Sequence, residues 1–199
     1  MNKLTRADLF SLERYAEVRP EFRARVMRHK QSRQLPIGDH ATLYFEDTLT
    51  MQYQVQEMLR IERIFEAAGI EEELEAYNPL IPDGDNWKAT FMLEYPDEDE
   101  RRDALTRLVG IEDKVWMRVD GFDPVWAIAD EDLERADEGK TSSVHFMRFQ
   151  LSPGMVDAAR SGKAISAGID HPECNAVVAP IAENVRASLV QDLQAIEKL

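Results

Sequence analysis

Apolar residues recur at helical spacing from Phe45 to Phe65, which predicts one long central helix. The expected core stripe of this helix is Met51, Val55, Met58, Ile61 and Phe65. Two further apolar residues widen the stripe, so the polar side chains of the helix occupy a narrow arc or are themselves partly buried. We expect the rest of the fold to be arranged around this helix.

Two shorter helices are predicted before the central helix and one after it. Ala7–Glu17 and a segment from Pro20 to about Ser32 are expected to be separate helices, because the residue before a proline avoids the α region. Gly69 is expected to end the central helix, and Ile70–Ala76 to form a short acidic helix.

The second half of the chain alternates apolar and polar residues, the pattern of half-buried strands. A short strand is predicted from His40 to Phe45, and further strands from Ala89 to Tyr95, Val115 to Asp120, Val125 to Ala129, Ser143 to Leu151 and Ile165 to Ile169. Helices are predicted between or after these strands at Asp97–Val109, Asp130–Glu138 and Ser152–Ser161, with a last helix from Pro180 to about Ile196.

A run of helices followed by a run of strands indicates an α+β fold. We expect the N-terminal helices and the central helix to pack on a mostly antiparallel sheet of about four to six strands. The C-terminal helix either packs back on this body or forms a homodimer contact. The predicted organisation is a single domain over residues 1–172, with a helical arm at 1–38 and a body at 39–172, followed by a C-terminal helical extension at 173–199.

Composition excludes several classes of protein. Hydrophobic residues make up 44% of the chain and charged residues 31%, as in ordinary globular proteins. The chain has no run of about 18 apolar residues and no apolar secretory segment at its start, so a cytoplasmic location is expected. Cys174 is the single cysteine, which rules out an intrachain disulfide.

Charge is unevenly distributed along the chain. The net charge of −14 argues against nucleic-acid binding and against binding to anionic membranes, since both require a basic surface. Residues 1–34 hold nine Lys or Arg and four acidic residues, a net +5, which leaves −19 for the remainder. This basic arm either packs on its own acidic body or docks an acidic partner protein.

The central helix carries a row of hydrogen-bonding side chains that a plain core helix does not need. The candidate ligand-binding residues on it are Gln52, Gln56, Glu57, Arg60 and Arg63. Residues three or four apart are neighbours on a helix, so Glu57 can reach Arg60. The row is either a polar floor for a ligand or a paired structural network, because buried polar groups must find partners.

The segment from Tyr77 to Trp87 is a second candidate site. It is rich in proline, asparagine and aspartate, which predicts an ordered loop. Loops held on a rigid scaffold commonly carry function, so Asn78, Asn86 and Trp87 join the candidate ligand-binding residues. The alternative is a plain connection rich in turns.

Four residues are candidate metal ligands: Glu46, Glu94, His145 and His171. Histidines on or near strands, with carboxylates close by, are how zinc and harder metals are bound, so a metal ion is a candidate cofactor. A histidine in the middle of a strand, such as His145, is also typical of a core group with satisfied hydrogen bonds. The chain has no Walker loop, GxGxxG, HExxH or GxSxG motif, so no reaction follows from a motif.

Four stretches carry a resemblance to a known family. They read HATLYFEDTLTMQYQVQEMLRIERIF, AYNPLIPDGDNWKATFMLEYPD, TSSVHFMRF and AGIDHP. Over roughly residues 3–172 the chain resembles a bacterial family catalogued as domain of unknown function 3501. Genes of such proteins often lie near those for rubrerythrin and for an iron–sulfur protein similar to a component of glycerol-3-phosphate dehydrogenase. The resemblance assigns no catalytic residues.

Two functional hypotheses follow. The first is an accessory or binding protein linked to a redox or peroxide-defence system, with an iron–sulfur or rubrerythrin-like protein as its partner, as the resemblance implies. The second is a small metal- or ligand-dependent enzyme, with its site between the central helix, the loop Asn78–Trp87 and the sheet.

Overall fold

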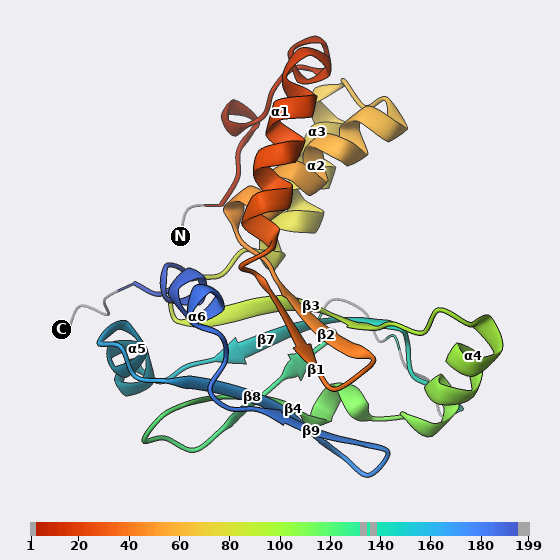
Figure 1. Cartoon of the computed structure of the whole chain (residues 1–199). Coiled ribbons are helices and arrows are strands. Elements are labelled where there is room, and N and C mark those ends of the chain that lie inside the picture. Colours follow the sequence, from red (N-terminus) through yellow and green to blue (C-terminus); the bar gives the residue numbers. More distant parts are fainter. Residues whose placement is uncertain (1–2, 132–134, 136–138, 195–199) are drawn as a thin grey trace.

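The computed structural model describes residues 3–131, Arg135 and residues 139–194. These residues form an α+β fold, as the sequence predicts, in which a layer of helices stands over two sheets (Figure 1). The helical layer consists of α1 (Leu12–Lys30), α2 (Thr48–Glu62) and α3 (Ala67–Tyr77). The central helix of the sequence analysis is α2, and it belongs to this layer.

Instead of one sheet, the described residues form a five-stranded sheet A and a four-stranded sheet B, with antiparallel pairing throughout. The order in sheet A is β1 (Gln34–Ile37), β2 (Ala41–Phe45), β3 (Asn86–Leu93), β7 (Val144–Gln150) and β6 (Ile128–Ala129). The order in sheet B is β5 (Val125–Trp126), β4 (Val115–Val119), β8 (Ile165–His171) and β9 (Cys174–Val178). The predicted return of Val125–Ala129 is thus shared between the two sheets.

The main hydrophobic core lies between the two sheets, and alternation along the strands decides which side chains enter it. Every second residue of β3 and β7 is buried in this core, as predicted, including Phe91, Met147 and Phe149. The residues between them lie on the opposite, outer face of sheet A, toward the helical layer. The register places Thr90 opposite Phe146 on that outer face.

The remaining helices lie around the sheets. Helix α4 (Glu98–Arg107) lies at one end of the molecule, and α5 (Pro153–Arg160) and α6 (Glu183–Val190) lie toward the other (Figure 1). Short 3-10 turns are formed by η1 (Arg6–Asp8), η2 (Asn78–Leu80) and η3 (Ile111–Lys114). Among the described residues, no helix is long and apolar enough to cross a membrane.

The C-terminal helix packs back on the body. Its buried residues Val185 and Leu189 belong to the same core as the facing sheets. The predicted start of the C-terminal extension, residue 173, falls between β8 and β9, which are hydrogen-bonded neighbours. Residues 195–199, at the end of the predicted last helix, lie outside the described part of the chain, as does most of the predicted helix Asp130–Glu138.

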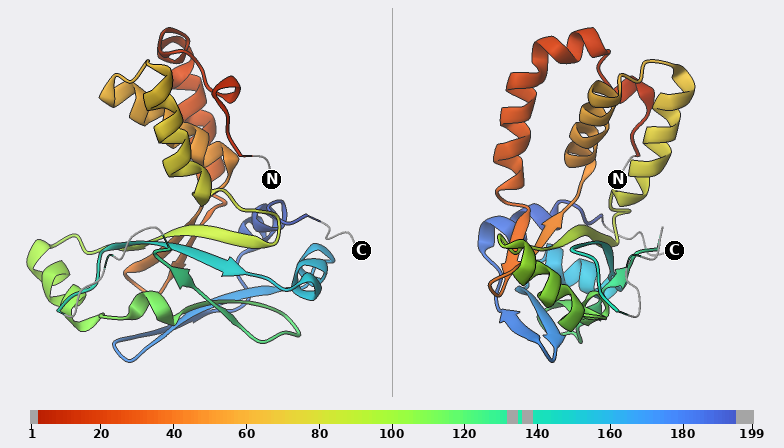
Figure 2. Two further views of the ribbon diagram at one scale, coloured as in Figure 1. Left: turned by 180° about the vertical axis from the view of Figure 1, so that it is seen from behind. Right: turned by 90° about the vertical axis from the view of Figure 1, so that its right-hand side faces the viewer.

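The predicted break before Pro20 is wrong. Pro20 lies inside the continuous helix α1, which bends along its length (Figure 2). A proline within a helix removes one backbone hydrogen bond and bends the helix. Pro20 is exposed, so water can solvate the carbonyl that loses its partner. The helix predicted over Ala7–Glu17 correspondingly begins later, at Leu12.

The predicted end of the central helix at Gly69 is also wrong. Helix α2 stops at Glu62, and Arg63 forms its C-cap in the left-handed conformation with φ 56°. Gly69 lies inside α3, where a Cβ atom would come within 2.7 Å of Ile64 Cγ2. Glycine is therefore needed there for close packing. The last two residues of the predicted core stripe, Ile61 and Phe65, are exposed at and beyond the end of α2.

Candidate ligand-binding groove

Two residues of the predicted polar row on α2 bind the N-terminal segment of the chain. The Gln52 side chain donates to the backbone oxygen of Asp8 at 2.6 Å. The Gln56 side chain is fully buried, and its Oε1 accepts from the backbone N–H of Phe10 at 2.5 Å. These contacts hold the residues before α1 against α2.

Glu57 is the centre of a second set of contacts between α1 and α2. It accepts from the Tyr15 hydroxyl at 2.6 Å and from Arg19 at 2.7 and 2.9 Å. Arg60 donates to the same carboxylate at 3.1 Å, as the spacing predicted. The hydrogen bond from Arg19 is the largest influence that lowers the pKa of Glu57, to about 2. The carboxylate is thus ionised and paired.

The candidates around the Tyr77–Trp87 loop are also tied into the fold. Asn78 accepts from the backbone N–H of Leu4 at 2.8 Å and donates to its carbonyl at 2.9 Å. Asn86 accepts from the backbone N–H of Asp83 at 3.1 Å. Trp87 is fully buried in the core, and its indole N–H donates to the carbonyl of Leu189 at 3.0 Å. Asn86 and Trp87 are the first residues of β3 rather than loop residues.

The two histidines among the four metal-ligand candidates form hydrogen bonds with separate groups of the protein. His145 is fully buried, with Nδ1 2.6 Å from Asp130 Oδ2 and Nε2 2.9 Å from the Thr141 hydroxyl. His171 is buried at the end of β8, with Nε2 3.2 Å from the carbonyl of Val109.

The two glutamates among those candidates lie elsewhere. Glu94 is exposed to solvent and accepts from the Tyr44 hydroxyl at 3.0 Å, while Glu46 is buried beside α2. Within the described ranges, no three His, Cys, Asp or Glu residues are grouped so that they could hold a metal ion. The four candidates are therefore not brought together. Burial raises the pKa of the Cys174 thiol, which disfavours its reactive thiolate form.

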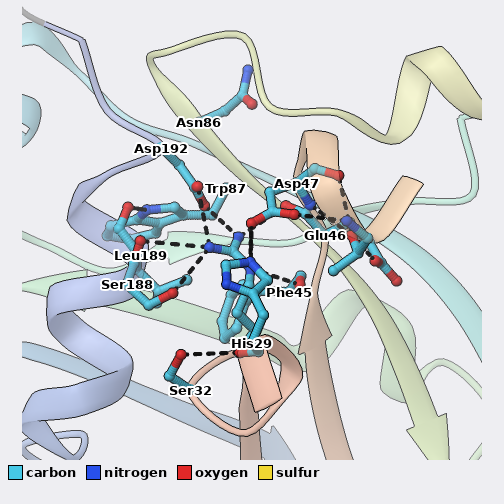
Figure 3. A network of polar contacts seen from close by, with 12 residues as sticks. His29, Ser32, Phe45, Glu46, Asp47, Asn86, Trp87, Ser188, Leu189 and Asp192 are labelled. Atoms are coloured by element: carbon cyan, nitrogen blue, oxygen red, sulfur yellow. Dashed lines mark hydrogen bonds and ion pairs between the residues drawn. The ribbon is translucent and has the colours of Figure 1, made fainter. Parts of the chain in front are cut away.

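The junction between the helical layer and the sheets is a buried polar network (Figure 3). Arg33, just after α1, donates to both carboxylate oxygens of Asp192, at 2.6 and 3.2 Å. It also donates to the backbone carbonyls of Phe45 and Glu46. Burial raises the pKa of Asp192 to about 6, and the neighbouring Arg33 opposes that rise. Sequence analysis did not single out either member of this pair.

Asp47 lies in the same network, where it caps the start of α2 and contacts the His29 ring. Burial alone would raise the pKa of Asp47, but Arg33 and the Thr50 N–H hold it below its ordinary value. Every buried side-chain nitrogen and oxygen in the described part of the chain has a hydrogen-bond partner. The network thus fixes the position of the segment Phe45–Asp47.

An open pocket of about 610 Å³ lies beside this junction, between the helical layer and the outer face of sheet A. Its apolar wall comes from all three helices, the η2 turn and two strands: Met27, Met51, Tyr77, Leu80, Met92 and Phe146. Polar side chains from the end of α1, from β1 and from α2 line it as well: Lys30, Gln31, Gln34 and Gln54. Ligand pockets commonly combine this size with a mostly apolar lining and a few polar groups.

A second pocket of about 590 Å³ adjoins the first, since both are lined by Tyr77, Leu80 and Phe146. It continues along the β3–β7 pair to Lys88 and Arg148, which lie opposite each other in the register. We call the two pockets together the groove. Lys88 and Arg148 at its far end are paired with Asp83 and Glu131, respectively.

Glu46 is the one predicted metal-ligand candidate that lines the groove. Its side chain is 7% exposed, and its two carboxylate oxygens accept from the hydroxyls of Thr50 and Thr90 at 2.6 and 2.8 Å. The predicted polar row lies elsewhere on α2, while Met51 and Gln54 of that helix line the groove. Two other lining residues, Thr90 and Phe146, could have been found from the alternation of apolar and polar residues along the strands. That alternation places both side chains on the outer face of sheet A, away from the main core.

Comparisons with known proteins give a family but no activity. The search of curated proteins gave no match. A crystal structure of a protein of unknown function from Burkholderia pseudomallei K96243 is 52% identical to this chain, covers 97% of it and 100% of its own chain, and superposes with a TM-score of 0.92.

The family comparison covers more of the chain than the stretches singled out above. The model of the family described as "Protein of unknown function (DUF3501)" matches residues 3–193. The match takes in β9, α6 and Asp192, which lie beyond the stretches of the sequence analysis. This chain therefore belongs to that family of proteins of unknown function.

Proposed function

We propose that this protein is a binding protein whose ligand, a small molecule with an apolar body, occupies the groove. The groove itself carries the proposal: two adjoining pockets of about 610 and 590 Å³, lined by aromatic and methionine side chains. Methionine adapts its shape easily and contacts aromatic rings favourably, which suits a surface that receives an apolar ligand.

The polar side chains around the first pocket support this proposal. Within the described ranges, the side chains of Lys30, Gln31, Gln34 and Gln54 form no hydrogen bond or ion pair. The residues of the predicted polar row are instead bound to the protein's own backbone and side chains. Groups without internal partners are the ones available to orient a ligand.

A link to redox or peroxide-defence systems is the finer part of this proposal. It is supported by the family resemblance, since genes of such proteins often lie beside those for rubrerythrin and an iron–sulfur protein. On this view the ligand-bound protein serves as an accessory to that system. Affinity capture from the native host should recover such a protein, and capture without it would remove this link while leaving the groove proposal intact.

Binding of a neutral apolar fluorescent probe, N-phenyl-1-naphthylamine, tests the groove directly. Met92→Trp places a large ring in the groove, whereas Val177→Trp adds the same ring to an exposed position in β9 of sheet B. We expect saturable binding by the wild type and Val177→Trp, and about tenfold weaker binding by Met92→Trp. Absence of saturable binding, or equal binding by all three proteins, would refute the proposed function.

A further inference from the structure

We infer that the groove selects an organic cation, a protonated amine on an apolar body, and that the Glu46 carboxylate receives its charge. This inference rests on the proposed function and names the class of ligand. Three features of the groove carry the inference: the state of Glu46, the distribution of neighbouring cations, and the aromatic lining.

Glu46 is a buried carboxylate whose hydrogen bonds leave acceptor capacity for a ligand. Each of its oxygens accepts one hydrogen bond from a threonine hydroxyl, Thr50 from α2 and Thr90 from β3. A carboxylate offers about four lone-pair sites, so roughly two remain. Both threonines also hold the carboxylate in place, because they come from different layers of the fold. The acceptor is therefore oriented before a ligand arrives.

Glu46 also has no ion-pair partner among the residues that the structure describes, although it is more than nine-tenths buried. The negative charge of Glu46 helps to raise the pKa of Arg33. The Arg33 guanidinium nevertheless binds the carboxylate of Asp192, and it contacts Glu46 only at the backbone carbonyl. Buried carboxylates are normally paired. A ligand ammonium would supply the missing partner.

Lys30 is the cation that lines the same pocket. It is only partly buried, so water and salt screen its charge more than that of a fully buried group. Lys88 and Arg148, farther along the groove, are neutralised by Asp83 and Glu131. Glu46 is thus the buried charged side chain that lines this pocket without an ion-pair partner, and its charge is negative.

The remaining lining suits a cation with an apolar body. The rings of Tyr44, Tyr77 and Phe146 line the pocket that contains Glu46. Aromatic faces attract ammonium groups, and the attraction grows when water is excluded. The net charge of −14 also raises the local concentration of cations around the protein. Burial, charge and lining therefore favour the same ligand class.

Three naphthalene compounds that share one apolar body separate the effect of charge from that of shape. We would measure the binding of 1-naphthylmethylamine, 1-naphthalenemethanol and 1-naphthoate by titration calorimetry at neutral pH. The amine should bind about tenfold more tightly than the alcohol, and the naphthoate more weakly than either. In Glu46→Gln, which keeps the size of the side chain, the preference for amine over alcohol should fall to about twofold.

Glu100→Gln is the matched control, because it removes a carboxylate on α4 that is exposed to solvent and does not line the groove. It should keep the amine preference of the wild type. Equal binding of the three compounds, tighter binding of the naphthoate, or an amine preference that persists in Glu46→Gln would overturn the inference alone. Failure of all three compounds and of the neutral probe to bind would instead refute the proposed function.

Discussion

Arg33 and Asp192 form an ion pair across 159 positions of sequence, with both side chains only 2% exposed. The carboxylate follows α6, and the guanidinium lies between the end of α1 and the start of β1. The pair therefore joins the helical layer to the C-terminal helix beside sheet A.

Removing one member of this pair should be strongly destabilising. Asp192→Ala leaves Asp47, whose Oδ2 lies 3.4 Å from Arg33 Nε, as the remaining carboxylate beside the buried Arg33 charge. We expect a loss of about 3 kcal/mol in the free energy of unfolding, measured in urea. The double variant Arg33→Met/Asp192→Leu should recover part of that loss, because it removes the buried charge but also the donors to the carbonyls of Phe45 and Glu46. Glu183→Gln breaks the exposed pair with Arg186 on the same helix and should cost less than about 1 kcal/mol. Similar losses for Asp192→Ala and Glu183→Gln would contradict the assigned role.

Acid should weaken the attachment of α1 to α2 through Glu57. The unfolded chain protonates this group near pH 4.5, whereas the folded protein protonates it only near pH 2, so acid favours the unfolded state. The stabilisation is complete above pH 4.5 and is lost as pH falls toward 2. Because Arg19 is partly exposed, we expect about 2 kcal/mol rather than the full value of the shift.

The check compares wild type with Glu57→Gln, by urea unfolding at pH 5, 4, 3 and about 2.5, so that the other carboxylates cancel. The difference in stability between the two proteins should shrink steadily across this range. A difference that does not vary with pH would show that Glu57 is not held ionised in the folded state.

Gly168 should tolerate no side chain. A Cβ atom there would lie 2.3 Å from Trp116 Cζ2 and 2.9 Å from the carbonyl oxygen of Ala176. We expect Gly168→Ala to lower the free energy of unfolding by about 2 to 3 kcal/mol and to shift the tryptophan emission. On a Trp116→Leu background the same alanine should cost less, since the ring contact is gone. Equal losses of stability on both backgrounds would mean that the Trp116 ring is not what excludes a side chain at position 168.

The end of α2 offers a stabilising substitution. Arg63 has φ 56°, a conformation that glycine adopts without the steric cost of a side chain. Arg63→Gly should therefore raise the free energy of unfolding by about 0.5 to 1 kcal/mol. Glu62→Gly, one residue earlier and still helical, should lower it by a similar amount. If both changes lower the free energy of unfolding, the contacts of the Arg63 side chain stabilise the protein by more than its left-handed conformation costs.

Most strands were predictable because alternation is a local signal, but β1 and β9 were not predicted. The pattern that puts Phe91 and His145 on the same side as their buried neighbours predicted β3 and β7 together with their inner faces. Helix boundaries were less predictable. Pro20 is accommodated by a bend in an exposed helix, and Gly69 is required by close packing against Ile64 rather than by a helix end. Neither fact is visible in the local pattern.

The candidate site was only partly predictable for a different reason. Gln56 and Asn78 look like ligand-binding residues in sequence because their partners, Phe10 and Leu4, are distant backbone groups. The groove is likewise assembled from residues that become neighbours only when helices and strands meet. Glu46 was predicted as a metal ligand from its type and position, whereas its hydrogen-bond partner Thr90 comes from a strand distant in sequence.

The separation of Arg33 from Asp192 sets an order of events during synthesis. A ribosome that adds about 5 to 20 residues per second reaches Asp192 roughly 8 to 30 s after Arg33, 159 positions later. Until then Arg33 can pair with Asp47 but lacks the closer carboxylate of Asp192, and Ser188 of α6 cannot yet accept its hydrogen bond. The region around Glu46 is therefore among the last to take its final shape, and the ligand binding proposed above depends on the docking of the C-terminal helix.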